Sequence, residues 1–503
     1  MFRRGILLVA GVATVATLVA CSGGGSDDDD AADDGGGQVT DSEPVRGADV
    51  AQPAVTGPVT AGTHDGPFNA MPSGLADRYG YVEEEYFLEG DASAYAVQGE
   101  QSEDGAWDVT EAGTAPYKTR IIVRRPADAD DFSGTVYVEW LNVTAGVDGD
   151  PDFGLTHPAI LGDGSAYVGV SAQRAGIEGG GVLGIPGVEV QALKQWDPER
   201  YGSLVHPGDH YSYDIYSQAA QAVRRPGDVD VLDGLEVRHV IAMGESQSAA
   251  RMVTYVDAVH PVAGIYDGFL VHSRGGGGAP LEDTPDILGQ GVVHIRDDLD
   301  VPVMQFETET DLFGVLGFHR ASQDDTDMLR TWEVAGTAHA DQAILDYNRE
   351  LSGDVGGGGF DLAAMCGTIN QGPQAPVVRA ALSALRDWVV DGTAPPESPR
   401  LEVAGEAIAR DARGIALGGI RTPGVDAPVS VLTGVAPEGR SILCMLFGDT
   451  VPFDAATLAS LYPDDDDYVA AVTESADAAV EAGFLLRADA DAFIEAAGEA
   501  DLG

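Results

Sequence analysis

Lysine is almost missing from this chain of 503 residues, in which Lys118 and Lys194 are the only two. Lysine and arginine together number 28 against 82 aspartates and glutamates, so the formal net charge is -54. A protein that binds nucleic acid needs basic patches that neutralise phosphates, and nucleic acid is therefore not an expected partner. An anionic bilayer would repel the same charge, so membrane attachment has to come from something other than the protein surface.

Cysteine is also scarce, with only Cys21, Cys366 and Cys444 in the chain. None of them stands in a C-x-x-C spacing and the sequence contains no H-E-x-x-H, so nothing in it supports a zinc enzyme. We therefore expect no metal and no cofactor. In an exported chain Cys366 and Cys444 can form a disulfide, and two free buried thiols are the alternative.

The first twenty residues have the pattern of a secretory signal peptide. Arg3 and Arg4 precede an apolar run, 5–20, which is shorter than the roughly 20 residues of a bilayer span. The run ends in Leu18-Val19-Ala20-Cys21, which resembles a bacterial lipobox. Residues 1–20 are thus predicted to be a lipoprotein signal peptide, with Cys21 acylated after cleavage. The alternative is a plain signal peptide followed by an incidental cysteine.

Residues 21–52 are rich in glycine, aspartate and serine and include an unbroken acidic run at 27–30. This composition offers almost nothing apolar to bury and predicts a disordered acidic tether. Together with Cys21, it predicts an exported protein of the cell envelope, anchored to a bacterial membrane through its lipid.

From residue 53 onward, extended apolar segments alternate with helical ones, which is typical of an α/β fold with a mostly parallel central sheet flanked by helices. We expect strands at 81–88, 93–97, 119–123, 135–140, 166–171, 237–243, 262–270, 301–306, 331–334 and 429–432, the first two as an antiparallel pair. We expect helices at 211–224, directly after 246, and at 377–390, 466–482 and 488–497. The part from about 341 is predicted to pack on the sheet as a C-terminal helical extension of a single domain, 53–503.

The pentapeptide Gly244-Glu245-Ser246-Gln247-Ser248 stands between an apolar run and a helix-prone stretch, as a nucleophile elbow does. An elbow holds a serine on a strained turn between a strand and a helix, with the usual pattern G-x-S-x-G, from which Ser248 departs. The alternative for Ser246 is an ordinary helix N-cap. A rival serine, Ser171, also follows an apolar run, but the glycine-rich sequence after it is not expected to start a stable helix.

A serine nucleophile needs an imidazole to accept its proton and a carboxylate to orient that imidazole, in the chain order serine, acid, histidine for this type of elbow. Asp311 follows the strand at 301–306 and is the first choice of acid, with Glu309 as the alternative. His339 follows the strand at 331–334 in a loop of small residues. His319 also comes after the acid, but it lies in a more irregular stretch.

The developing negative charge on the substrate needs two hydrogen-bond donors, an oxyanion hole. The backbone N–H of Gln247 is the first candidate. A backbone N–H at Leu141 or Asn142, in the loop after the strand at 135–140, is the second, and the alternative for Asn142 is that it only caps the turn.

Five sequence motifs resemble those of the bacterial α/β hydrolase domain proteins: Tyr-Lys-Thr-Arg (117–120), Val-Glu-Trp-Leu-Asn-Val (138–143), Gly-Glu-Ser-Gln-Ser-Ala (244–249), Thr-Glu-Thr-Asp (308–311) and Gly-Gly-Ile-Arg-Thr-Pro (418–423). The resemblance covers nearly the whole chain from about residue 55. It implies an α/β-hydrolase fold and serine-hydrolase chemistry, makes Ser248 a variant of the family, and places both late cysteines in the same domain. It leaves the substrate open.

These observations predict an exported, lipid-anchored serine hydrolase, and among serine hydrolases a carboxylic-ester hydrolase that acts on a small-molecule ester through Ser246, His339 and Asp311. The alternatives are an amidase or peptidase with the same triad, and a lipoprotein that binds a ligand on a hydrolase fold without turnover, because fold does not fix function.

Overall fold

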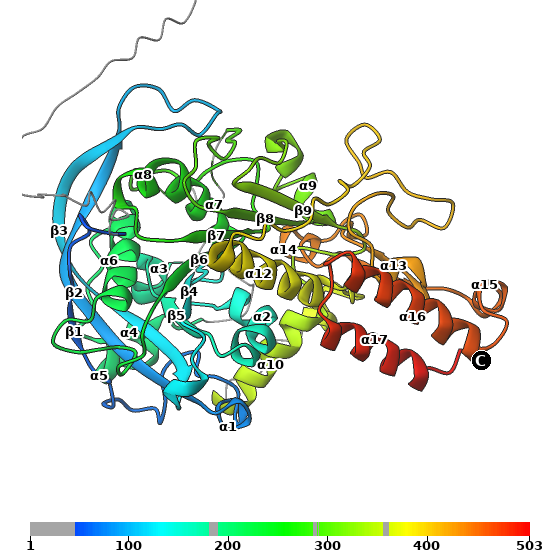
Figure 1. Ribbon diagram of the computed structural model, residues 1–503, viewed down its shortest axis with the longest axis horizontal. Helices are drawn as coiled ribbons and strands as arrows, with labels where there is room; N and C mark the ends of the chain where they lie inside the picture. The colour runs from blue at the N-terminus through cyan, green and yellow to red at the C-terminus, as the bar shows by residue number, and fades with distance from the viewer. Residues whose placement is uncertain (1–45, 181–189, 285–288, 290, 356–361, 503) are drawn as a thin grey trace, which may run out of the picture. The chain divides into compact units, whose positions relative to one another are not determined.

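Nine strands form one sheet within the residues that the computed structural model describes, which are 46–180, 190–284, 289, 291–355 and 362–502. The strands lie side by side in the order β1-β2-β3-β5-β4-β6-β7-β8-β9 (Figure 1). Their bounds are β1 (Ala54–Thr56), β2 (Tyr81–Val97), β3 (Val109–Pro126), β4 (Thr135–Trp140), β5 (Ala166–Val170), β6 (His239–Glu245), β7 (Gly268–His272), β8 (Val303–Thr308) and β9 (Leu329–Val334).

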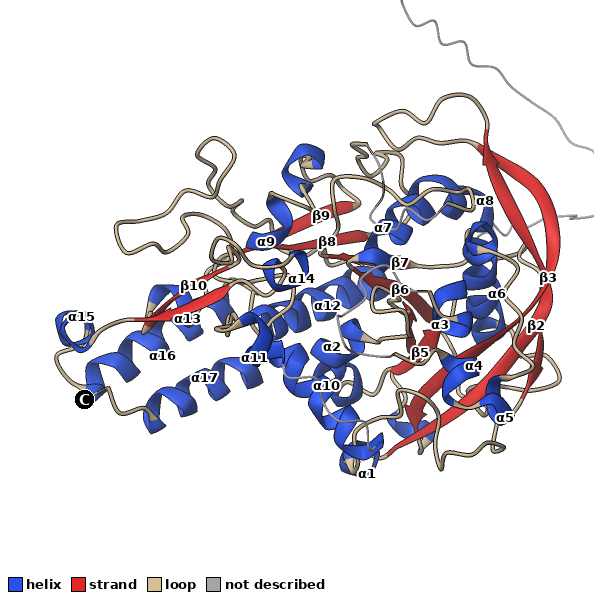
Figure 2. Cartoon of the chain, turned by 180° about the vertical axis from the view of Figure 1, so that it is seen from behind, coloured by secondary structure: helices blue, strands red, loops and turns tan. Residues whose placement is uncertain are grey.

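The sheet changes direction at β5. The pairings β1 with β2, β2 with β3 and β3 with β5 are antiparallel, and all pairings from β5 through β4 to β9 are parallel. The long strands β2 and β3 form a curved ribbon at one side of the sheet (Figures 1 and 2). Because parallel strands all end at the same edge, the loops that follow β4, β6, β8 and β9 meet there.

Helices cover both faces of the parallel part. On one face, α6 (Ser212–Arg224) and α7 (Gln247–Thr254) pack on alternate residues such as Val240 and Ala242 of β6. On the other face, α2 (Pro151–Gly162) and α12 (Gln374–Asp391) pack on Ile241 and Met243. Figure 1 shows the two groups of helices on opposite sides of the strands. Strands with two covered faces are apolar throughout rather than alternating, which is why short apolar runs predicted them.

The helices of the described residues include several very short ones. Their bounds are α1 (Leu75–Tyr79), α2 (Pro151–Gly162), α3 (Arg174–Glu178), α4 (Leu193–Trp196), α5 (Pro198–Tyr201), α6 (Ser212–Arg224), α7 (Gln247–Thr254), α8 (His260–Ala263), α9 (Glu309–Leu312), α10 (Gln342–Val355), α11 (Leu362–Cys366), α12 (Gln374–Asp391), α13 (Pro423–Asp426), α14 (Ile442–Met445), α15 (Ala455–Leu461), α16 (Asp465–Glu481) and α17 (Arg487–Glu499). Among the residues described, no helix has both the length and the apolar character to cross a bilayer.

The C-terminal extension is attached to the sheet at several points. Helix α12 contributes Val377 and Val378 to the apolar core on one face, and Ile420 forms a parallel bridge with Val334 of β9. Beyond it, β10 (Ser430–Thr433) and β11 (Asp449–Pro452) form an antiparallel pair. Helices α16 and α17 lie side by side in both views (Figures 1 and 2). The described residues from Arg46 onward make up one compact unit.

The predicted signal peptide (1–20), the lipidation site Cys21 and the tether up to residue 45 lie outside the described residues. The end of the tether, 46–52, has to be corrected. The Gly47 N–H donates to the Gly264 carbonyl oxygen over 2.8 Å, and Val50 is buried in the core. This hydrogen bond and the burial of Val50 connect the segment to the rest of the fold, so the domain begins at about residue 46.

Two strand predictions are wrong in the structure. Segments 81–88 and 93–97 are not a pair but parts of the single strand β2, whose partner is β3. Gly90 between them is no turn residue: a Cβ there would lie 3.1 Å from Oε1 of Gln218, so it permits a close approach. Segment 262–270 is only partly a strand, because α8 occupies its start and Gly264, at φ 51°, ends that helix.

Candidate active site

The pentapeptide 244–248 forms a strand–turn–helix elbow at the edge where the parallel strands end. Strand β6 ends at Glu245, helix α7 begins at Gln247, and Ser246 between them has φ 59° and ψ -112°. Such a backbone is strained for any residue other than glycine, and strain of this kind is concentrated at functional sites. The elbow predicted from the sequence is therefore present, and Ser246 sits at its apex.

The missing second glycine of the elbow has a steric explanation. A Cβ at Gly244 would lie 3.0 Å from the Cβ of Ser248 and 3.1 Å from Cγ of Met252, both on α7. Real Cβ atoms do not approach other atoms so closely without a shift of the neighbour. The space left free by Gly244 is therefore the space that Ser248 uses, and one glycine suffices for the strand and the helix to pack.

Ser246, His339 and Asp311 are joined by two hydrogen bonds of equal length. The Ser246 Oγ lies 2.7 Å from Nε2 of His339, and Nδ1 of His339 lies 2.7 Å from Oδ1 of Asp311. A carboxylate only accepts, so Nδ1 carries a proton that it donates to Asp311, and Nε2 of the neutral ring is left to accept the Ser246 hydroxyl proton. Ser246 and His339 are 93 positions apart along the chain, and Asp311 and His339 are 28 positions apart. The fold brings the three residues together.

The loop that carries His339 is fixed to the segment that carries its partner, Asp311. The second carboxylate oxygen of Asp311 accepts from the backbone N–H of Thr308 (2.6 Å) and from its hydroxyl (2.7 Å), and the backbone N–H of His339 donates to Oγ1 of Thr310 (3.2 Å). Burial disfavours the imidazolium, but Asp311 and then Glu245 outweigh burial and raise the pKa of His339 above its usual value. A raised pKa makes His339 a stronger base.

The alternative acid, Glu309, has a different role and does not contact His339. Its Oε1 accepts from the backbone N–H of Gly336 (2.6 Å), and its Oε2 pairs with Arg410 (2.6 Å) and accepts from the N–H of Gly434 (3.0 Å). Its fully buried carboxylate therefore joins the loop before His339 to the C-terminal extension. The other candidate histidine, His319, is exposed, and its ring lies tilted against that of Phe313 with 5.1 Å between the centroids.

The second oxyanion donor was assigned to the wrong residues. The N–H of Leu141 donates to the Val170 carbonyl oxygen (3.2 Å) and that of Asn142 to the Gly149 carbonyl oxygen (2.9 Å), so neither group is available to a substrate. The next N–H, of Val143, points instead to the Gln247 side chain, with 3.5 Å between N and Oε1. A bond of that length is weak. Gln247 itself opens α7, where backbone N–H groups have no acceptor within the helix.

The Asn142 side chain also does more than cap a turn. Its Oδ1 accepts from the N–H of Thr144 (2.8 Å), which is the capping role, while its Nδ2 donates to the backbone oxygen of Glu245 (3.0 Å). Asn142 therefore connects the loop after β4 to the elbow.

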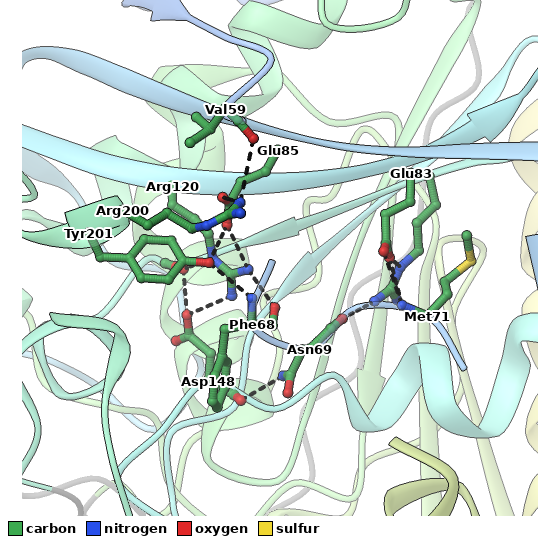
Figure 3. Close-up of polar contacts among 12 residues, drawn as sticks. Val59, Phe68, Asn69, Met71, Glu83, Glu85, Arg120, Asp148, Arg200 and Tyr201 are labelled. Atoms are coloured by element: carbon green, nitrogen blue, oxygen red, sulfur yellow. Dashed lines mark hydrogen bonds and ion pairs between the residues drawn. The ribbon is translucent and has the colours of Figure 1, made fainter. Parts of the chain in front are cut away.

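Two buried arginines hold the far end of that loop. Arg120 lies between Glu85 (3.4 Å) and Asp148 (3.1 Å), as Figure 3 shows. Arg124 donates to Asp150 over 2.7 Å. Neither arginine side chain is exposed, and a buried charge left without its partner is strongly destabilising. These ion pairs thus attach the loop that contains Val143 to β2 and β3.

The rival serine, Ser171, belongs to this ion-pair network. Its Oγ accepts from Nε of Arg120 (3.0 Å) and donates to Asp148, and the side chain is fully buried. One expectation about it was wrong, because the five-residue helix α3 does follow it, starting at Arg174. The helix is too short to change the assignment, and the partners of Ser171 give it a structural role.

Sequence reasoning missed three polar groups around the triad. Oε1 of Glu245 lies 3.4 Å from Nε2 of His339. His272, at the end of β7, pairs with Asp152 over 2.7 Å, and both side chains are fully buried. The sequence signal for Glu245 is its position directly before Ser246. The His272 pair had no signal beyond a histidine at the end of a strand, because Asp152 lies 120 residues away.

Cys366 at the end of α11 and Cys444 in α14 form a disulfide in the structure. The backbone N–H of Ala340, next to His339, donates to the Leu446 carbonyl oxygen over 3.0 Å, so α14 is connected to the histidine loop. In the part of the chain that the structure describes, no group of His, Cys, Asp and Glu side chains could hold a metal ion.

The strand order, the elbow and the positions of Ser246, Asp311 and His339 after β6, β8 and β9 define the class of this protein as an α/β hydrolase. The chain belongs to the α/β hydrolase domain family, whose model matches residues 55–495. The match confirms both the family resemblance of the motifs and the predicted fold class, and it spans the sheet and most of the C-terminal extension.

Several solved structures are similar to this chain at low sequence identity. An esterase from Rhizomucor miehei is 12% identical with a TM-score of 0.25, and the match covers 54% of this chain and 82% of that chain. An α/β serine hydrolase from Xanthomonas campestris is 11% identical with a TM-score of 0.26, covering 52% and 94%. A glucuronoyl esterase from Solibacter usitatus is 11% identical with a TM-score of 0.28, covering 58% and 82%. No curated protein matches the chain.

Proposed function

We propose that this α/β hydrolase is a serine hydrolase that cleaves carboxylic esters through an acyl-enzyme on Ser246. The observation that carries the proposal is the continuous chain of hydrogen bonds from Ser246 through His339 to Asp311, with 2.7 Å at each step. A serine hydroxyl is a poor nucleophile unless a base takes its proton as it attacks. His339 is placed to act as that base, next to Ser246 at the apex of the strained elbow.

In the first half-reaction the Ser246 oxygen attacks the ester carbonyl carbon while Nε2 of His339 takes the hydroxyl proton. The carbonyl oxygen becomes an oxyanion, which the backbone N–H of Gln247 and, in place of Leu141 or Asn142, that of Val143 would bind. For Val143 this requires exchange of its long bond to the Gln247 side chain for one to the substrate. His339 then gives the proton to the leaving alkoxide, and the acyl group stays on Ser246.

In the second half-reaction water attacks the acyl-enzyme, His339 accepts a proton from the water, and the Ser246 oxygen leaves with that proton. The carboxylic acid is released and the enzyme returns to its starting state. Asp311 keeps its proton-free state throughout and holds the ring of His339 in the tautomer that both steps need.

A fluorophosphonate probe tests the nucleophile, because it modifies an activated serine covalently. We expect the probe to label the protein and Ser246→Ala to abolish labelling. Ser248→Ala is the matched control, since it removes a hydroxyl two residues away whose oxygen makes no hydrogen bond to the described residues. Labelling that persists in Ser246→Ala would contradict the nucleophile. A wild-type protein that stays unlabelled would favour a ligand-binding protein without turnover.

The bond that is cleaved is tested with matched p-nitrophenyl esters and p-nitroanilides of short acyl groups. Release of p-nitrophenol much faster than release of p-nitroaniline supports the ester hydrolase. Comparable turnover of the anilides would favour the amidase or peptidase.

A further inference from the structure

Glu245 places a second carboxyl group at the nitrogen of His339 that faces the nucleophile. Its Oε1 lies 3.4 Å from Nε2, the atom that is also 2.7 Å from Ser246 Oγ. Orientation of the ring does not require it, because Asp311 already accepts from Nδ1 on the other side. The proposed reaction therefore leaves this carboxyl without a function, although it adjoins the atoms that react.

The position of Glu245 is fixed by its surroundings. It is the last residue of β6, its Oε2 lies 3.2 Å from Nδ2 of Asn142, and the residue is 8% exposed. A side chain held in this way stays at the site when a substrate enters, so a substrate has to accommodate the carboxyl group.

Five side chains from five different elements act on Glu245. His339 from the loop after β9 and Asn142 from the loop after β4 contact its carboxylate, and the charges of His272 from β7, Asp152 from α2 and Asp311 from α9 also act on it. Burial, followed by Asp152 and Asp311, raises the pKa of Glu245 to about 7, against the opposing effect of the two histidines. Near neutral pH the group thus changes between a neutral acid and an anion.

The cationic partners of this region are histidines. In the part of the chain that is described, the ion pairs of Glu245 are with His339 alone, and those of Asp152 are with His272 alone. Arg410 is paired with Glu309, and Arg120 and Arg124 are paired with their own carboxylates. Arg274, two residues after His272, has no ion pair with a described carboxylate and donates to backbone oxygens and to Gln305. Among the described residues, an anionic group on the substrate would meet Glu245 beside imidazoles, and the guanidinium groups named here already have hydrogen-bond acceptors.

We propose that Glu245 acts as a charge filter for the esterase. The substrates are esters with neutral or cationic groups beside the scissile bond, and esters with a carboxylate at that position are rejected. The proposal rests on the ester hydrolysis proposed above. Two like charges within a few ångströms repel each other strongly in a partly buried site, and the repulsion grows as Glu245 ionises.

The experiment compares kcat/KM for two p-nitrophenyl esters of similar size, the neutral butyrate and the anionic hemisuccinate, in the wild type and in Glu245→Gln. The glutamine keeps the shape of the side chain and removes its charge. We expect the wild type to have a higher kcat/KM for the butyrate than for the hemisuccinate. The ratio of the two values should be about tenfold smaller in the variant. The preference of the wild type should rise between about pH 6 and about pH 8, and that of Glu245→Gln should stay flat.

The ratio of the two esters separates filtering from a general effect on His339, because any change in the base affects both esters equally. Glu245→Asp, which keeps the charge, should retain the preference. Glu481→Gln, an exposed residue of α16, removes one unit of charge far from the site and should leave the ratio unchanged.

Turnover with the same ratio in wild type and Glu245→Gln would overturn the charge filter and leave the ester hydrolase intact. Hydrolysis of neither ester, together with no labelling by the fluorophosphonate, would overturn the proposed function and the filter with it.

Discussion

Asp311 and Glu309 are two residues apart in the short helix α9, yet their carboxylates have unrelated partners. Two residues of a helix are about 200° apart around its axis, so the side chains point in nearly opposite directions. Asp311 points to His339, and Glu309 points to Arg410 and the backbone of Gly336 and Gly434. The sequence predicts both acids directly after the strand that became β8, but it does not predict the direction in which each side chain points.

The change Asp311→Asn tests the orienting acid. An amide at this position can hydrogen-bond the ring in the wrong tautomer, with the proton on Nε2, so kcat should fall roughly 10,000-fold with little change in KM. His339 has to be neutral to accept a proton, and Asp311 raises its pKa. The acid limb of the kcat/KM profile should therefore move to lower pH in the variant. Initial rates over the neutral range measure both effects, and an unchanged kcat would contradict the role.

Glu309→Gln should mainly affect stability. It removes one partner of a buried ion pair with Arg410 and weakens two backbone hydrogen bonds, so the free energy of unfolding should fall by about 3 kcal/mol. Urea unfolding measures this loss. The folded fraction should keep most of its kcat, whereas a collapse of kcat at unchanged stability would return Glu309 to the triad.

At the scale of elements, the elbow depends on how closely β6 and α7 approach. Gly244→Ala brings a methyl group to 3.0 Å from the Cβ of Ser248, which should cost about 1 to 3 kcal/mol and displace Ser246. Adding Ser248→Gly should restore part of the stability and of kcat by removing the clashing side chain. Thermal unfolding and ester hydrolysis of the single and double variants test this. Equal losses in both would show that Ser248 is not the residue in the way.

The inner strands were predictable because both of their faces are covered. Thr135–Trp140 was expected with these bounds, and Val303–Thr308 and Leu329–Val334 were expected to within two residues. The errors came where a local signal was overruled by packing. Gly90 and its neighbours look like a turn, but pairing with β3 keeps the chain extended. The run at 262–270 is mostly apolar, yet its first two residues belong to helix α8.

The disulfide operates at the scale of the whole molecule. It joins residues 78 positions apart and connects α11 to α14, which contacts the histidine loop. Replacing both cysteines by serine should lower the free energy of unfolding by about 2 to 4 kcal/mol, because the unfolded chain regains the freedom of a long loop. It should also raise the rate of inactivation on heating. Calorimetry with and without reductant checks this, and an unchanged unfolding temperature would contradict it.

The predicted membrane attachment also belongs to the scale of the whole chain. The folded domain is strongly acidic and should be repelled by anionic lipid, so we propose that the lipid at Cys21 alone holds the protein to a bacterial membrane. Cys21→Ala should move the protein from the membrane fraction to the soluble fraction, with kcat unchanged. Fractionation with an immunoblot measures this. An equal share in the membrane fraction would sink the lipid anchor.

The sequence by itself determined the fold class, the elbow, and the order of nucleophile, acid and histidine, because short apolar runs and small residues express local backbone requirements. Only the tertiary structure decided which acid faces His339, that Leu141 and Asn142 spend their N–H groups on other backbone carbonyls, and that Glu245 lies beside the reacting nitrogen. These outcomes depend on side-chain directions and on hydrogen bonds between different segments of the chain, which no local pattern encodes.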